Sequence, residues 1–162
     1  MKITISRKLV VSVVSVLAAA AMAAFGGIAW SQASESPSGV QLVADDHLAT
    51  LTVTDIQPGD EVTRLVTIRN SADRPARLAF TEQGDPADYR DGQLGLSVDA
   101  DGRQVYAGQF GAMADLTQDM GLVGAGESVT FRFTVSLPDE VTYLAPGGES
   151  ATASYAWVLV PV

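Results

Sequence analysis

The chain contains no cysteine, and lysine occurs only at positions 2 and 8. An exported form would therefore have to be stable without disulfides, which favours a bacterial setting over a small secreted eukaryotic scaffold. An isopeptide cross-link needs a lysine amine, so beyond Lys8 that chemistry is excluded and any assembly must be non-covalent. Histidine occurs once, as His47. Neither a zincin site with two histidines nor a Cys–His nucleophile can be assembled, and no nucleophile-elbow sequence supports a Ser–His–Asp triad.

The first 33 residues have the pattern of a secretion signal. Three cations are followed by an apolar run over residues 9–30, and the chain then turns polar over Ser31-Gln32-Ala33-Ser34-Glu35-Ser36. Small residues at −3 and −1 predict that a signal peptidase cuts between Ala33 and Ser34, with a cut after Ser31 as the alternative. Because about 20 apolar residues can also span a bilayer, an uncleaved anchor is the rival interpretation, and residues 9–30 would then be the only contact with the membrane. The cleaved signal and the uncleaved anchor both predict that the chain is exported.

The charge of the remaining chain excludes two classes of partner. A cut after Ala33 leaves 129 residues with seven arginines and 19 acids, a net charge of −12. Binding to nucleic acid or to anionic lipid depends on neutralisation by Lys and Arg, so we expect neither. The length is that of a single domain with one core.

Apolar residues recur with a period of two, which predicts strands. Val129, Phe131 and Phe133 alternate with polar residues, and Tyr155 and Trp157 share one face of a later strand, where we expect core packing rather than a binding platform. We predict an all-β fold, a two-sheet antiparallel β-sandwich of jelly-roll or Ig-like type, preceded by the apolar signal helix. The expected strands are 40–43, 48–55, 62–69, 76–82, 94–99, 103–107, 128–136 and 151–160. The expected organisation is a signal at 1–33, a flexible segment at 34–47 and a sandwich domain at 48–162.

Turn residues separate these runs at the spacing of a sandwich. Asp101-Gly102 predicts a hairpin, and one short helix is expected from Phe110 to Leu116, with Met113 and Leu116 as its apolar contacts. The segment Pro58–Thr63 is echoed by Ala125–Thr130 at an offset of 67 residues. This repeat predicts two related halves of the sandwich, with chance similarity as the alternative.

Two segments resemble a known family. The segment Asp55–Asn70, with Pro58-Gly59-Asp60 before a strand, resembles the TasA/camelysin family of exported bacterial matrix proteins, and Phe25–Ser31 is similar to the end of signals cut by a SipW-type peptidase. The resemblance implies a jelly-roll-like sandwich whose members assemble into extracellular fibres of a biofilm matrix. It also implies that an N-terminal strand of one subunit completes the sheet of the next.

The segment available for that role is Gly39–Leu48, in which Val40 and Leu42 are the apolar assembly residues. An ordinary first strand in the sheet of its own chain is the alternative. Candidate metal ligands are few. His47 could supply one ligand of a site built with Asp45 or Asp46, and the two carboxylates of Asp99 and Asp101 are of the type that binds Ca²⁺. Solvated turns are the favoured interpretation of both pairs, so we predict no cofactor and no catalytic residue.

The sequence supports three candidate functions. The first is an exported structural protein that associates with itself or with other matrix or cell-surface proteins. The second is a membrane-anchored, Ig-like binding module on the cell surface. The third, a camelysin-like metallo-endopeptidase, is disfavoured by the single histidine.

Overall fold

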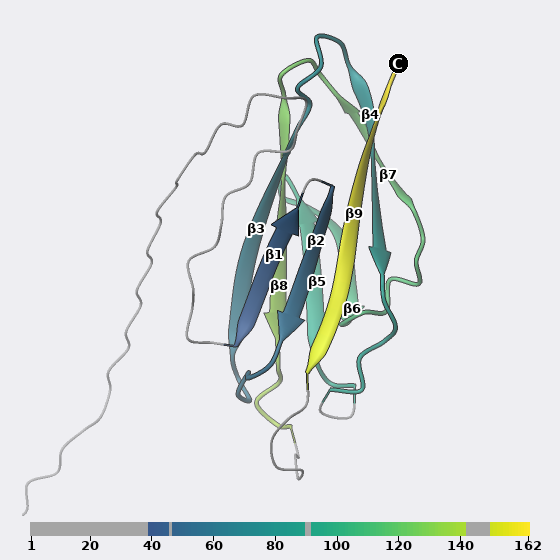
Figure 1. Ribbon diagram of the computed structural model, residues 1–162. Helices are drawn as coiled ribbons and strands as arrows, with labels where there is room; N and C mark the ends of the chain where they lie inside the picture. Colours follow the sequence, from purple (N-terminus) through teal and green to yellow (C-terminus); the bar gives the residue numbers. More distant parts are fainter. Residues whose placement is uncertain (1–38, 46, 90–91, 142–149) are drawn as a thin grey trace, which may run out of the picture.

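The computed structural model describes residues 39–45, 47–89, 92–141 and 150–162, and within these residues the chain forms nine strands and no helix (Figure 1). The strands are β1 (Val40–Asp45), β2 (Leu48–Val53), β3 (Glu61–Arg69), β4 (Ala76–Gln83), β5 (Gly95–Ala100), β6 (Arg103–Gln109), β7 (Gln118–Val123), β8 (Ser128–Ser136) and β9 (Ala151–Pro161). The eight ranges predicted from the period of two coincide with β1–β6, β8 and β9. Their ends differ by at most two residues.

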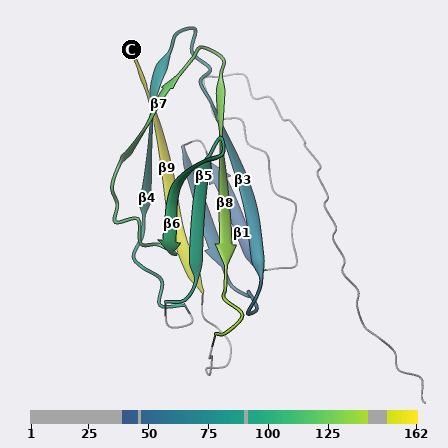
Figure 2. The same cartoon turned by 180° about the vertical axis from the view of Figure 1, so that it is seen from behind.

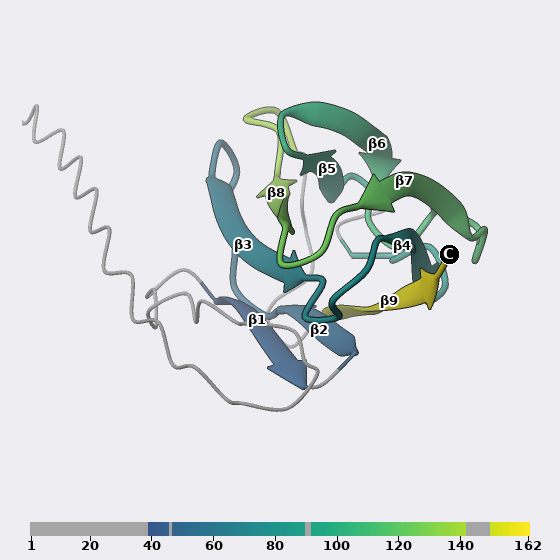
Figure 3. The same ribbon diagram turned by 90° about the horizontal axis from the view of Figure 1, so that it is seen from above.

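The strands form two antiparallel sheets packed face to face, which confirms the predicted β-sandwich. One sheet has the order β1-β2-β9-β4-β7 and faces the viewer in Figure 1; the other has the order β3-β8-β5-β6 and faces the viewer in Figure 2. The view along the strands in Figure 3 shows the two layers, with the edge strands β1 and β3 on one side and β7 and β6 on the other.

The core lies between the sheets and is rich in aromatic rings. Phe80 on β4 is central: its ring centroid lies 5.0 Å from that of Phe131, 5.4 Å from that of Trp157 and 5.9 Å from that of Tyr155. Tyr155 and Trp157 are 0% and 2% exposed, so the predicted core packing is confirmed. Each such ring contributes about 1.5–3 kcal/mol by leaving water, and the tilted and edge-on ring contacts add to this.

The sequence echo corresponds to β3 and β8, which pair with each other in one sheet. Each copy has the same turn: the Gln57 amide donates to the Asp60 carboxylate, and 67 residues later the Gly124 amide donates to the Glu127 carboxylate. Gly59 and Gly126 have φ angles of 85° and 74°, a backbone that suits glycine. The repeat therefore relates two neighbouring strands about a local two-fold arrangement.

The Asp101-Gly102 hairpin is confirmed. β5 and β6 pair antiparallel up to Ala100 and Arg103, and the two turn residues have φ angles of 47° and 80°. Two positive φ angles in a two-residue loop are those of a type I′ turn, which matches the twist of the strands.

The predicted helix at Phe110–Leu116 is wrong. These residues form turns, and Ala114 and Asp115 have φ angles of 65° and 54°, which an α-helix cannot contain. Phe110 and Met113 are buried, as their apolar character suggested, but Leu116 is 66% exposed. The segment closes one end of the core as an irregular loop rather than as a helix.

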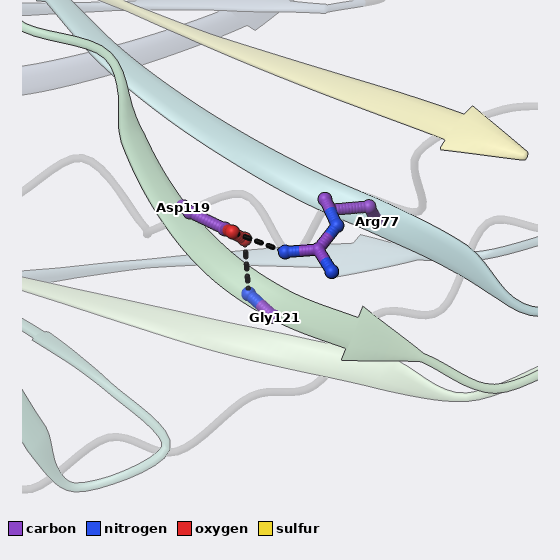
Figure 4. Close-up of polar contacts among 3 residues, drawn as sticks. All are labelled: Arg77, Asp119 and Gly121. Carbon is purple, nitrogen blue, oxygen red and sulfur yellow. Dashed lines mark hydrogen bonds and ion pairs between the residues drawn. The ribbon is translucent and has the colours of Figure 1, made fainter. Parts of the chain in front are cut away.

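Strand β7 was not expected, because a bulge interrupts its alternation. Opposite Leu78 and Ala79 of β4 the register shifts from Gly121 to Asp119, which leaves Met120 as the extra residue. The Gly121 amide donates to the Asp119 carboxylate at 2.9 Å, and Arg77 of β4 pairs with the same carboxylate (Figure 4). Both interactions lower the pKa of Asp119, the bond from Gly121 more strongly.

Candidate assembly strand and interaction groove

Strand β1 contains the predicted assembly residues and forms the edge of the five-stranded sheet. It pairs antiparallel with β2 of the same chain, from Val40 opposite Val53 to Asp45 opposite Leu48. Val40 is 1% exposed and Leu42 packs against the core, whereas Val43 on the outer face is 65% exposed. β1 therefore contributes to the core although, within the described ranges, β2 is its only neighbour in the sheet.

The carbonyl group of Val40 points away from β2. Gly39 accepts the amide of Thr54 at 2.8 Å, so Gly39 forms a hydrogen-bonded pair with β2. In an antiparallel ladder such pairs alternate, so the polar backbone groups of Val40 face the opposite side. A buried carbonyl in that position needs a donor from elsewhere.

Arg64 of β3 supplies this donor across the gap between the sheets. Its Nε and Nη2 atoms donate to the Val40 carbonyl oxygen at 3.2 and 2.7 Å, and Nη1 donates to the Thr63 carbonyl oxygen at 2.9 Å. The side chain is 7% exposed, and this burial lowers its pKa. The sequence contains the signal for it, since Arg64 occupies an inward position between Val62 and Val66 where the alternation predicts an apolar residue.

A second feature lies where β9 extends beyond β2. The register of β2 with β9 ends at Leu48 opposite Ala156, followed by one bond from the Trp157 amide to the His47 carbonyl at 3.1 Å. β9 continues to Pro161, and over this stretch β4 is its one strand partner among the residues that the structure describes. By the same alternation, the amide and carbonyl of Leu159 point to the side without a neighbouring strand in the described part of the chain.

An apolar groove of about 490 Å³ runs beside this part of β9. It lies between the end of the β1–β2 hairpin, β9 and the end of β3 with its following loop. Its lining is His47, Leu48, Ile68, Arg69, Asn70, Ser71, Ala72, Ala76, Ala156, Trp157, Val158, Leu159 and Pro161. Arg69 and His47 place cationic or protonatable groups at the rim in a chain whose net charge is −9. An unpaired strand edge beside an apolar groove is the geometry that accepts an extended peptide.

Asn70 fixes the loop that forms one wall of this groove. Its side-chain amide donates to the carbonyl groups of Arg74, Val123 and Gly124 at 2.9–3.1 Å, and its Oδ1 accepts the Ala72 amide at 3.1 Å. The residue is 2% exposed. The sequence predicted a turn here but gave no indication that the asparagine joins the loop before β4 to the end of β7.

Glu82 is a buried carboxyl group that the sequence analysis did not single out. It lies on the inward face of β4 opposite Tyr155 of β9, is 0% exposed, and accepts the Met113 amide at 2.8 Å. Burial raises its pKa, the bond from Met113 lowers it, and the charge of Asp115 raises it. Burial and the negative charge of Glu82 also raise the pKa of Tyr155. The carboxyl therefore ties the loop after β6 to the core.

Among the described residues, no group of three His, Asp or Glu side chains could hold an ion. Asp101 accepts the Thr130 amide at 2.9 Å, and Asp99 lies opposite Gln104 and Arg132 in the sheet. His47 is exposed at the groove, and the side chain of Asp45 lies outside the described residues.

The signal, its cleavage site at Ala33 and Ser34, and the apolar run at 9–30 also lie outside the described residues. Within the described ranges, no helix has the length and apolar character needed to cross a membrane.

Comparisons with known proteins give no family. The sequence matches no family model and no curated protein. Among solved structures, the chain is similar to a protein of T=1 particles derived from infectious bursal virus, with 14% identity and a TM-score of 0.31. That match covers 87% of this chain but 36% of the viral one, so the chain spans about a third of that protein's length.

Proposed function

We propose that the chain is an exported structural protein that associates with further copies of itself, without covalent bonds, in an extracellular matrix or on a cell surface. The proposal includes cleavage of the signal after Ala33 and assigns no catalytic role and no cofactor to the chain. It is supported by the resemblance of Asp55–Asn70 to the TasA/camelysin family and by the position of β1.

The observation that carries the proposal is that β1 is an edge strand with a buried apolar face and, among the described residues, a single strand neighbour. If β1 leaves its own β2 and pairs with β2 of a second copy, every contact of Val40 and Leu42 is formed again between chains. The exchange therefore costs little beyond the entropy of association. Two residues separate Asp45 from Leu48, and a short hinge of this kind favours strand exchange when it extends.

Exchange in one direction uses two different surfaces, the β1 strand and the vacated edge of β2. Such a heterologous contact gives open filaments unless the rotation between copies closes a ring. Fibre formation is thus the expected result of a one-way exchange, and a closed dimer is the result of a reciprocal one.

We also propose that the sandwich is a jelly roll. The order β2-β9-β4-β7 opposite β3-β8-β5-β6 supports this, because it joins strands from the two ends of the chain as two interlocked Greek keys.

Light scattering and negative-stain microscopy over a concentration series test the assembly. We compare a chain that starts at residue 34 with one that starts at residue 48 and lacks β1. The longer chain should form oligomers or fibres, whereas the shorter one should remain monomeric and should cap growing assemblies of the longer one. A monodisperse longer chain at every concentration would overturn the proposal.

The groove beside β9 favours a second candidate, a binding module for an extended segment of an acidic partner. Leu159 offers backbone groups, Leu48 offers apolar surface because its side chain is 49% exposed, and Arg69 offers a cation for a carboxylate. Trp157 is the only tryptophan after residue 33, so its fluorescence reports on the groove. Binding of extended peptides that alternate Leu and Asp should change this fluorescence, and Ala72→Arg should abolish the response while Ala125→Arg should not. An unchanged signal in the parent chain would exclude this function.

A further inference from the structure

β1 and β3 are neighbouring edges of different sheets, and in the part of the chain that the structure describes no backbone ladder joins them. The ladder with β2 holds one side of β1, through Gln41, Val43 and the other residues whose amides point to β2. The other side would present the Val40 carbonyl to the interior without a partner strand. The fork of Arg64 fills this position with two donated bonds to one oxygen.

These bonds are expected to be stronger than neutral ones. A guanidinium donates charge-assisted bonds in a fixed geometry, and Arg64 is nearly excluded from water. Arg64 is also held from behind, since its Nη1 donates to the carbonyl of Thr63 in its own strand. Because the guanidinium group of Arg64 is bonded to the backbone of both β1 and β3, it resists the movement of β1 away from β3.

We propose that Arg64 is a latch that sets the rate at which β1 leaves its own chain for a second copy. The inference rests on the proposed function. In an exchanged assembly the Arg64 of the acceptor chain binds the Val40 carbonyl of the incoming strand, so the same bonds are present before and after exchange. The latch therefore governs how fast β1 is released and leaves the final proportion of exchanged chains unchanged.

Hydrogen exchange by mass spectrometry measures release directly. In a dilute, monomeric chain that starts at residue 34, Arg64→Met should speed amide exchange in residues 40–45 by about ten- to a hundredfold, the factor expected when bonds from a charged donor are lost. Arg64→Lys keeps the cation but not the fork and should give a smaller increase. Arg132→Met is the matched control, because Arg132 lies exposed on β8 and does not contact β1.

Transfer between copies is measured separately, by native mass spectrometry of mixed ¹⁵N-labelled and unlabelled chains. Mixed oligomers should appear faster in Arg64→Met by the same factor and reach the same final proportion. Faster amide exchange without mixed oligomers would overturn the proposed function and leave the latch intact. Amide exchange in β1 equal to that of Arg132→Met would overturn the latch. If Arg64→Met does not fold, Arg64→Lys decides between the same outcomes.

Discussion

Glu82 predicts an unusual dependence of stability on pH. The residue is fully buried, with Tyr155 of β9 opposite it in the sheet and Asp115 as the nearby acid that raises its pKa. The pKa of Tyr106 on β6 is raised by burial and by Glu82, so both tyrosines are neutral below pH 8 and Asp115 is the charged group that acts on Glu82 there. The ionised form of Glu82 is the one that the interior disfavours.

The sign follows from proton linkage. A glutamate in the unfolded chain loses its proton near pH 4.3, whereas folded Glu82 keeps it to a higher pH. Between these two values the folded state binds more protons, so the free energy of unfolding falls as the pH rises through this window. Each unit by which the pKa is raised lowers stability above the window by about 1.4 kcal/mol.

Glu82→Gln removes this titration while an amide oxygen still accepts the Met113 amide. We expect the variant to be more stable than the parent chain at pH 7 by about 1–3 kcal/mol, the cost of an imperfectly paired buried polar group. The two should converge near pH 4. Urea unfolding followed by Trp157 fluorescence from pH 4 to pH 8 measures the difference, with the exposed Glu61→Gln as control. A constant difference across this range, or a variant less stable at pH 7 than at pH 4 relative to the parent, would refute the reasoning.

Two further predictions concern polar groups at opposite extremes of burial. Asn70→Asp places a carboxylate against the three carbonyl groups that Asn70 now binds, and we expect a loss of about 3–5 kcal/mol in thermal unfolding, as for a buried charge without a partner; a change in Tm of under 3 °C, far below that loss, would contradict this. Asp119→Asn removes an ion pair whose two side chains are each 54% exposed, and we expect no measurable change in Tm relative to the exposed control Asp73→Asn. A clear loss of stability would show that the bulge in β7 depends on this carboxylate.

Most strands of the fold could be predicted from the alternation of apolar and polar residues along the sequence. Val129, Phe131 and Phe133 could be assigned to one face because a pleated strand has a period of two and one face of each sheet must be buried. β7 could not be predicted from this pattern, because Gly121 and the extra residue Met120 interrupt the alternation in a strand of six residues. The turns at Phe110–Leu116 could not be predicted in this way, because Ala114 and Asp115 adopt positive φ angles that their residue types do not indicate.

Only part of the candidate site could be predicted from the sequence. Val40 and Leu42 were identified because they alternate, and both are packed against the core. Arg64 appears in the sequence as a break in an apolar phase, but its partner is a carbonyl 24 residues away in the other sheet. No local pattern specifies that pairing, nor the fact that β9 continues past the end of β2.

Cross-linking tests strand exchange most directly, because the chain has no cysteine of its own. Val43 and Thr50 face each other in the β1–β2 ladder, at a spacing that a disulfide can bridge. One chain carries Val43→Cys and another carries Thr50→Cys, and the two are mixed and oxidised. Exchange of β1 between copies predicts a disulfide-linked heterodimer well in excess of the half expected from random pairing, and no excess when Thr67→Cys, on the other sheet, replaces Thr50→Cys. Random proportions in both mixtures would contradict the account.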